Sequence, residues 1–354
     1  MKHIVLTGGG TAGHVTPNIA LMGRLKEQGY QISYIGSYNG IEKTLIEELG
    51  IPYYGISSGK LRRYFDLKNF TDPFRVLKGF SEARKLLKQL KPDVVFSKGC
   101  YVTVPVVVAA GRLKIPAIIH ESDMTPGLAN KLCIPSAVKV CCNFPETKGH
   151  LPEGKAVVTG TPIRPELLQG DADKGRAFTG FTSEKPVIMI IGGSLGAQAV
   201  NDAVRRILPE LLKDFQVVHL CGKGKRDDSK NDLKGYVQYE YIESELTDLF
   251  AMADIVISRA GANAICELQA LKKPNLLIPL SANASRGDQI LNARSFEKQG
   301  FSMVLMEENL TTASLIAAVD QLYADRDKYV QAMKDSRQMD SIDMIVNLIK
   351  EVSK

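Results

Sequence analysis

Residues 3–14 read HIVLTGGGTAGH, an apolar run that passes into a glycine-rich turn and ends on a histidine. An apolar run followed by such a turn and by a helical pattern is typical of the first strand, turn and helix of a Rossmann-like unit. The pattern returns at residues 186–193, PVIMIIGG, ahead of a second helical stretch at 197–211. Two such openings predict an α/β protein built from two doubly wound domains.

Short apolar runs alternate with helical patterns after both openings, which predicts parallel sheets covered by helices on both faces. We expect strands at 3–7, 31–35, 53–57, 93–97, 116–120, 138–142 and 156–160, and then at 186–193, 215–222, 236–241, 254–261 and 275–280. Prolines 162 and 165 indicate the link, so the expected domains are 1–162 and 163–338. A C-terminal helix over 339–354 could pack on either domain, including back on the N-terminal one. Ligands of open α/β sheets bind beyond the carboxyl ends of the strands, so we expect a site in a cleft that both domains face.

The net charge of +6 is concentrated in one segment, because residues 60–91 hold ten of the 45 Lys and Arg residues but three of the 39 acids. One local excess predicts one local anionic partner and argues against general nucleic-acid binding. No apolar run reaches the roughly 18 residues that span a membrane, and no signal peptide is recognised, so we expect a cytoplasmic protein. None of the six cysteines forms a C-x-x-C pair, which favours reduced thiols.

The first glycine turn fits the dinucleotide pattern G-x-G-x-x-G at residues 8–13. That pattern requires an acid at the end of the second strand to hold a ribose, and the first acid after that strand is Glu42, beyond Ser37. A nicotinamide cofactor is therefore disfavoured, whereas an anion site at the helix start remains, beside the alternative that the turn only packs the helix on the strand. His14 could accept a hydroxyl proton there, or could merely cap the turn.

Three further side chains follow strands in the second half. Ser194, in the second glycine turn, could donate to a phosphate or cap the next helix. Glu267, early in a helix after SRAGANAIC, suits a ribose diol. Alternatively, it is an acid that the helix dipole stabilises, or one that forms a surface salt bridge. Gln289, next to Asp288, offers hydrogen bonds to sugar hydroxyls, or belongs to a capped helix start.

Six motifs, taken together and in order, resemble the MurG family of peptidoglycan glycosyltransferases, which have the GT-B fold and belong to glycosyltransferase family 28. The motifs are TGGGTAGHVTPNIAL, HESDMTPGLANK, GTPIR, GGSLGAQAVN, SRAGANAICE and RGDQILNA, and they cover essentially the whole chain. The resemblance implies inverting transfer of N-acetylglucosamine (GlcNAc) from UDP-GlcNAc to the muramoyl 4-hydroxyl of undecaprenyl-diphospho-muramoylpentapeptide (lipid I). No metal or other cofactor is expected, since the D-x-D at 171–173 lies in a linker-like segment.

The resemblance also assigns roles to individual residues. His14 is the first choice for the base that takes the acceptor proton, and Glu121 is the second. On the donor side the resemblance implies that Glu267 binds the ribose and that Ile242 meets uracil through its backbone. It places Arg164 near the nucleotide, Ser194 near the diphosphate and Gln289 at the sugar hydroxyls. Thr11, Ala12 and Gly13 complete the site from the N-terminal domain. Asp123 stands where the family usually has Asn, RGDQ replaces a tandem glutamine, and Lys98-Gly99-Cys100-Tyr101 stands where the family often has Gly-Gly-Tyr.

Segment 60–91 carries Phe70, Phe74, Leu77 and Phe80 at helix-like spacing among its basic residues. Such a stripe is either core or an interfacial surface, and the excess charge favours peripheral contact with an anionic membrane, at its cytoplasmic face. Two other functions stay open from the sequence. One is a related glycolipid synthase that acts on diacylglycerol, and the other is a scaffold that binds nucleotide sugars without catalysis.

Overall fold

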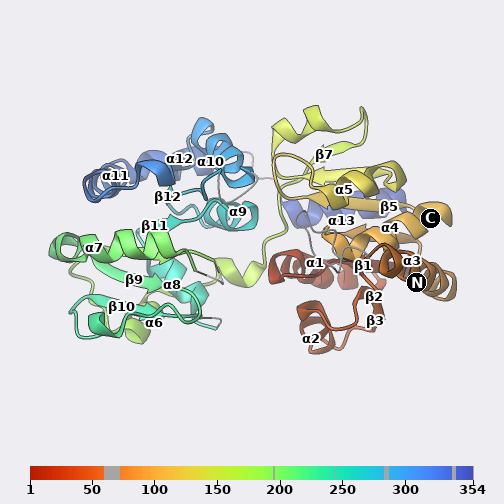
Figure 1. Ribbon diagram of the computed structural model, residues 1–354, viewed down its shortest axis with the longest axis horizontal. Coiled ribbons are helices and arrows are strands. Elements are labelled where there is room, and N and C mark those ends of the chain that lie inside the picture. Colours follow the sequence, from red (N-terminus) through yellow and green to blue (C-terminus); the bar gives the residue numbers. More distant parts are fainter. Residues whose placement is uncertain (60–71, 194–195, 243, 283–286, 337–339, 354) are drawn as a thin grey trace. The chain divides into compact units, whose positions relative to one another are not determined.

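The computed structural model describes residues 1–59, 72–193, 196–242, 244–282, 287–336 and 340–353. The chain divides into two compact units (Figure 1). Unit 1 comprises Met1–Arg164 with Met339–Lys354, and unit 2 comprises Pro165–Gln338. In the described residues no helix is long and apolar enough to cross a membrane.

Unit 1 is built on a parallel sheet of seven strands in the order β3-β2-β1-β4-β5-β6-β7. These strands are β1 (Lys2–Thr7), β2 (Tyr30–Ser37), β3 (Tyr53–Ile56), β4 (Val94–Ser97), β5 (Ala117–Glu121), β6 (Lys139–Cys142) and β7 (Ala156–Val158). The helices are α1 (Thr16–Glu27), α2 (Ile41–Glu47), α3 (Asp72–Leu90), α4 (Val104–Arg112), α5 (Leu128–Cys133) and α13 (Ser341–Val352).

Helices cover both faces of this sheet because successive strand residues point to opposite sides. Ile4 and Leu6 of β1 belong to a buried cluster shared with α1, α2 and α13, whereas Val5 belongs to a second cluster shared with α3 and α4. The C-terminal helix α13 is held in unit 1 by an ion pair between Arg24 Nε and Asp343 Oδ1 at 2.6 Å.

Unit 2 repeats the design with six parallel strands in the order β10-β9-β8-β11-β12-β13. Its strands are β8 (Val187–Ile191), β9 (Gln216–Leu220), β10 (Tyr236–Tyr239), β11 (Ile255–Ser258), β12 (Asn275–Leu277) and β13 (Met303–Val304). Its helices are α6 (Ala172–Thr179), α7 (Gln198–Asp214), α8 (Leu246–Met252), α9 (Ala262–Ala270), α10 (Asp288–Lys298), α11 (Thr312–Ala324) and α12 (Arg326–Asp335).

The prediction of two Rossmann-like α/β domains is confirmed, and every predicted strand is present. The two-residue strand β13 was not predicted, because so short a run carries no periodicity. All six cysteines are free, as predicted. The strand order reverses between β1 and β4 in unit 1 and between β8 and β11 in unit 2. Such reversal points are where open α/β sheets bind ligands, so the loops after these strands are the natural place for a site.

Candidate functional site

The first glycine turn leads from β1 into α1 through a short 3-10 helix, Ala12–His14. Gly10 adopts a φ of +80°, which a residue without a side chain tolerates best. Thr11 and Ala12 are exposed, and Gly13 is partly exposed. The turn therefore presents its backbone and the start of a helix to solvent at the reversal point of the sheet.

Glu42 lies beneath this turn with its carboxylate fully buried. The carboxylate accepts hydrogen bonds from the backbone N–H of Gly10 (3.1 Å), and from the N–H (3.0 Å) and hydroxyl (2.5 Å) of Ser37. A Cβ on Gly9 or Gly40 would lie within 2.5 Å of the Glu42 carboxyl group. These two glycines thus make room for an internal acid, which holds the turn from below, so Glu42 is not available to bind a ribose there.

His14 ends the turn and is partly exposed. Its Nδ1 lies 3.3 Å from the backbone oxygen of Lys98, and because a carbonyl only accepts, Nδ1 carries the proton. Nε2 then keeps its lone pair. Burial, followed by the charge of Lys98, lowers the pKa of His14 to about 4, against a smaller opposing effect of the hydrogen bond to the Lys98 carbonyl. His14 is therefore neutral at neutral pH and able to accept a proton at Nε2.

Glu121 ends β5 and, like Glu42, is buried. It accepts hydrogen bonds from the backbone N–H groups of Asp123 and Gly127, both at 3.0 Å, and from Asn130 Nδ2 at 2.8 Å. Burial raises the pKa of Glu121, while these hydrogen bonds oppose the rise. With three donors in place, its carboxylate orders the loop that carries the partly exposed Asp123.

The second glycine turn connects β8 to α7. Ser194, which was predicted to contact a phosphate, lies outside the described residues. Gly193 and Gly196 have φ of +81° and +67°, and a Cβ on Gly196 would meet the Cys221 carbonyl oxygen at 1.9 Å. This turn therefore approaches the backbone after β9 as closely as only glycine allows.

Three of the other predicted donor residues follow strands of unit 2, and Arg164 precedes that unit. Glu267 is partly exposed on α9, after β11. Gln289 is partly exposed in the first turn of α10, where its Oε1 accepts from the Leu280 backbone N–H at 3.0 Å, which directs the amide nitrogen elsewhere. Ile242 is buried in the loop after β10. Arg164 is exposed and is the last residue of unit 1 before the chain enters unit 2.

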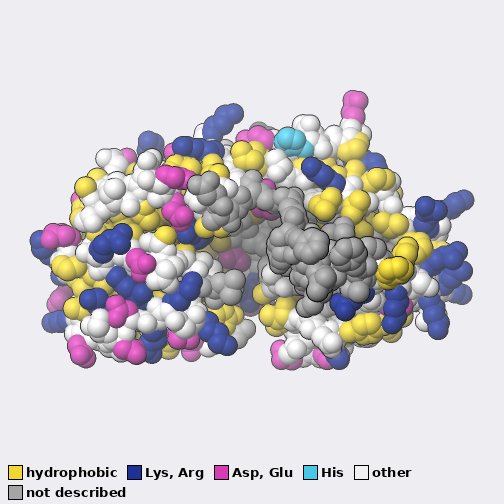
Figure 2. Space-filling model, viewed as in Figure 1, with side chains coloured by type: hydrophobic (Ala, Val, Ile, Leu, Met, Phe, Trp, Pro, Cys, Tyr) yellow, Lys and Arg dark blue, Asp and Glu magenta, His cyan; other side chains and the backbone are white. Residues whose placement is uncertain are grey.

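Helix α3 carries exposed apolar and basic side chains together. Phe74 and Leu77 are 74% and 66% exposed. The basic side chains of this helix gather beside apolar ones (Figure 2), and those that are exposed are Arg75, Lys78, Arg84, Lys85 and Lys88. Phe80 is half-buried and packs on the core, so the predicted stripe divides into a core part and an exposed part. Phe70 lies outside the described residues.

An apolar hollow of about 110 Å³ lies beside α3, lined by Val76, Tyr101, Val104, Leu128 and Leu132 among others. A Cβ on Gly10 would lie 3.2 Å from the Tyr101 ring, so this ring borders both the hollow and the first glycine turn. The hollow thus joins Tyr101, beside the turn, to Val76 of α3.

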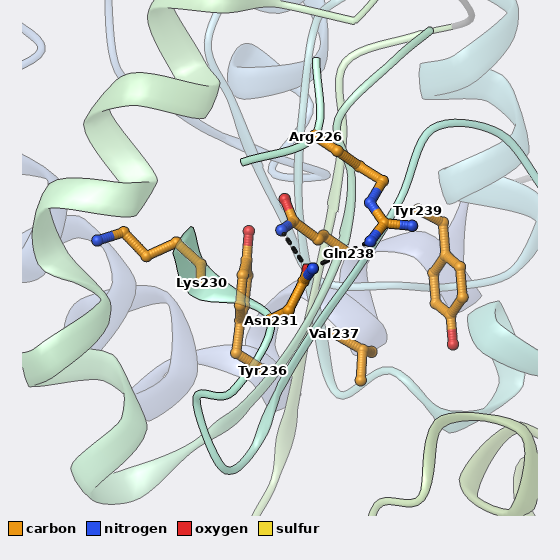
Figure 3. A pocket seen from close by; sticks show the side chains of 7 residues that line it. All are labelled: Arg226, Lys230, Asn231, Tyr236, Val237, Gln238 and Tyr239. Carbon is orange, nitrogen blue, oxygen red and sulfur yellow. Dashed lines mark hydrogen bonds between the residues drawn. The ribbon is translucent and has the colours of Figure 1, made fainter. Parts of the chain in front are cut away.

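A second, more polar hollow of about 360 Å³ lies along the edge strand β10 of unit 2 (Figure 3). Arg226 and Gln238 both donate to Asn231 Oδ1 across it, at 3.4 and 3.1 Å. None of the residues predicted for the site lines it. Within the described part of the chain, no three His, Cys, Asp or Glu side chains gather as a metal site would require.

Two residues that touch the predicted site were missed from the sequence. One is Glu42, and the other is Lys98, which directly follows β4 and is 1% exposed. The Lys98 Nζ lies 3.0 Å from His120 Nδ1 and also donates to the Ser122 hydroxyl. A lysine placed directly after an apolar strand, VVFS, at the reversal point of a sheet was the signal that could have revealed it.

Two family models match the chain: the glycosyltransferase family 28 N-terminal domain over residues 4–142 and the C-terminal domain over residues 187–348. A UDP-N-acetylglucosamine–N-acetylmuramyl-(pentapeptide) pyrophosphoryl-undecaprenol N-acetylglucosamine transferase of Lachnospira eligens is 70% identical over 100% of both chains. The Clostridium perfringens protein of the same name is 58% identical over 98% of both. Among solved structures, MurG of Acinetobacter baumannii is 28% identical with a TM-score of 0.77, covering 99% of this chain and 100% of that one.

Proposed function

This chain belongs to glycosyltransferase family 28, and we propose that it transfers GlcNAc from UDP-GlcNAc to lipid I, which gives lipid II for peptidoglycan synthesis. The observation that carries the proposal is the 70% identity, over the full length of both chains, to a relative named for this transfer. The presence of His14, Glu267 and Gln289 together supports an enzyme over a scaffold that only binds nucleotide sugars.

The reaction is a single displacement at the sugar. The acceptor 4-hydroxyl oxygen attacks C1 of GlcNAc, the bond from C1 to the diphosphate breaks, and its electron pair leaves with UDP. One attack from the opposite face inverts the configuration and gives a β linkage. The hydroxyl proton must go to a base, so one unprotonated side chain has to lie at the acceptor.

His14 is the base in this proposal. Its neutral state and its open Nε2 support that role, since a base must hold a lone pair toward the proton that it takes. Glu121 already accepts three hydrogen bonds from its own loop, which suits a positioning role better. Thr11, Ala12, Gly13 and Asp123 then contact substrate around His14.

Unit 2 holds the donor in this proposal. Glu267 accepts from the ribose hydroxyls, Gln289 donates to the sugar through its amide nitrogen, and the backbone of Ile242 meets uracil. Arg164 and Ser194 complete the contacts to the nucleotide. Backbone amides at the start of α7, a helix of 17 residues, stabilise the charge that develops on the leaving UDP, so we propose a metal-independent reaction.

The acceptor explains the exposed face of α3. Lipid I joins an anionic diphosphate to a long apolar chain, and α3 presents Phe74 and Leu77 among exposed basic side chains. The apolar hollow that Tyr101 borders suits the first part of the prenyl chain, next to the glycine turn. We propose that segment 60–91 binds an anionic membrane at its cytoplasmic face, with the protein peripheral.

The test measures UDP release by the purified protein from UDP-GlcNAc in EDTA, with lipid I analogues of natural and shortened prenyl length and with diacylglycerol as the competing acceptor. We expect turnover with the lipid I analogues and none with diacylglycerol. The His14→Ala variant should still bind UDP-GlcNAc but lose turnover, and His150→Ala, an exposed histidine of the same unit, is the matched control. Turnover with diacylglycerol, or binding of UDP-GlcNAc without turnover on any acceptor, would contradict the proposal.

A further inference from the structure

Lys98 is a buried cation at the reversal point of the unit 1 sheet. It follows β4 directly, its backbone N–H donates to the Thr7 oxygen of β1 at 2.9 Å, and its side chain is 1% exposed. A buried ammonium is costly unless polar groups surround it, so a lysine at this place calls for a role.

The Lys98 side chain is hydrogen-bonded to a neutral histidine, His120. His120 Nε2 lies 2.9 Å from the Gly160 oxygen and therefore donates to it, so Nδ1 holds the lone pair that faces Lys98 Nζ at 3.0 Å. Burial and the charge of Lys98 lower the pKa of His120 well below its ordinary value. The Lys98 ammonium also donates to the Ser122 hydroxyl.

The Lys98 main chain reaches the other histidine. Its carbonyl accepts from His14 Nδ1, so one residue touches His14 through its backbone and His120 through its side chain. Lys98 is a charged group that lowers the pKa of His14. Two acids belong to the same end of the sheet: Glu42 of α2, which contacts Gly10 of the glycine turn, and Glu121, which ends β5 next to His120. Each of these acids accepts three hydrogen bonds, Glu42 from Gly10 and Ser37, and Glu121 from its own loop.

Substrate binding changes the field at His14. Under the proposed function, UDP and the acceptor each bring a diphosphate, and nearby negative charge raises the pKa of a histidine by roughly 1–3 units. Starting from the ordinary value near 6.5, His14 would then be mostly protonated at neutral pH and unable to act as a base. Starting from about 4, the same rise brings it to a working value near neutrality.

We propose that Lys98 is a positioning residue that keeps His14 unprotonated, with Nε2 open to the acceptor hydroxyl, while anionic substrates are bound. The proposal rests on His14 being the base of the proposed function. The Lys98 carbonyl fixes the tautomer of His14, and the buried Lys98 ammonium offsets the charge of the diphosphates.

The first test is NMR of 15N-histidine-labelled protein without substrate, with the His14 signals among the five histidines identified by their loss in His14→Ala. In the native protein we expect the Nδ1–H tautomer and no protonation of His14 down to about pH 5. In Lys98→Met the pKa of His14 should rise by about one unit or more. Lys98→Arg keeps the charge and should titrate close to the native protein. Lys26→Met, an exposed lysine on α1, should titrate like the native protein.

The second test is the pH profile of turnover. In Lys98→Met the acidic limb of kcat should move to higher pH, whereas a merely structural role would lower kcat equally at every pH. An unchanged His14 titration in folded Lys98→Met would overturn the proposal. So would a native His14 that titrates near 6.5 or carries its proton on Nε2, and that result requires no variant to fold. Because the titration uses free protein, absent transferase activity would contradict the proposed function alone.

Discussion

Removing the Glu42 carboxylate should loosen the first glycine turn. In Glu42→Ala the backbone N–H groups of Gly10 and Ser37 and the Ser37 hydroxyl all lose the acceptor that the fully buried Glu42 supplies, although Gly10 is exposed and Ser37 partly exposed. Hydrogen bonds to a charged group contribute about 1.5–3 kcal/mol each, but such losses are not additive. We expect unit 1 to lose about 2–4 kcal/mol, a large part of an ordinary domain's stability.

Glu42→Gln separates charge from shape. Glutamine keeps the volume and one acceptor oxygen, but its amide nitrogen must face a donor, either Gly10 or Ser37. The expected loss is about 1–3 kcal/mol, so stability should fall in the order native, Gln, Ala. Glu47→Ala removes an exposed acid from the same helix α2 and should change stability little.

Hydrogen exchange followed by mass spectrometry measures this effect unit by unit, which avoids assuming that the two units unfold together. Peptides covering residues 1–14 and 30–47 should exchange faster in Glu42→Ala, whereas peptides from β8 and α7 serve as the internal reference. Turnover should fall with the ordering of His14, while UDP binding to unit 2 persists. Native exchange at Gly10, with stability within about 0.5 kcal/mol of the native protein, would refute the argument.

Three further outcomes are expected. First, with His14 as the proposed base, kcat/KM, which reports the free enzyme, should stay level as the pH falls from 7 to about 5 and decline only near 4, because a base must be unprotonated and the pKa of His14 is lowered to about 4; a decline centred near 6.5 would count against His14. Second, Cys100→Gly should stabilise unit 1 by about 1 kcal/mol in urea unfolding, because Cys100 holds a φ of +83° that glycine adopts without strain; an unchanged or lower midpoint would be the contrary result. Third, changing Arg75, Lys78 and Arg84 of α3 to Glu should weaken binding to anionic vesicles in a salt-dependent manner. The control is the same change at Lys234, Lys298 and Lys334 of unit 2. Partitioning that does not respond to salt would argue against an electrostatic surface.

The strands and the two glycine turns could be predicted because their signal is local. Ile4, Val5 and Leu6 are buried on alternating sides of one sheet, and such a run reads as a buried strand from composition alone. The resemblance of six motifs then located the residues expected to carry the chemistry. β13 was missed because two residues that pair at a sheet edge have no period to detect.

The supports of the site could not be predicted, since they depend on side chains that meet only in the fold. Glu42 was noted only as an acid too far along the chain to hold a ribose, yet it lies buried against a turn 32 residues away. Lys98 stood out as a departure from the family pattern, but its contact with His120 joins β4 to β5. Sequence distance gives no measure of either contact.

The two glycine turns follow corresponding strands, β1 and β8, at the reversal points of their sheets. They differ in the charged side chain that contacts them, and this difference bears on which turn receives the donor diphosphate. In unit 1 an internal carboxylate already binds the Gly10 amide and places negative charge below the turn. In unit 2 it is a cation that touches the turn, since Lys225 Nζ donates to the Gly196 oxygen at 3.2 Å. Negative charge beneath a turn opposes a second anion at the same amide, whereas a neighbouring cation favours one. This difference supports unit 2 as the donor side and leaves the unit 1 turn to position His14. The Glu42→Lys variant should therefore not bind UDP in unit 1, because the hydrogen bonds that Glu42 accepts from Gly10 and Ser37 would be lost and the turn would no longer be held.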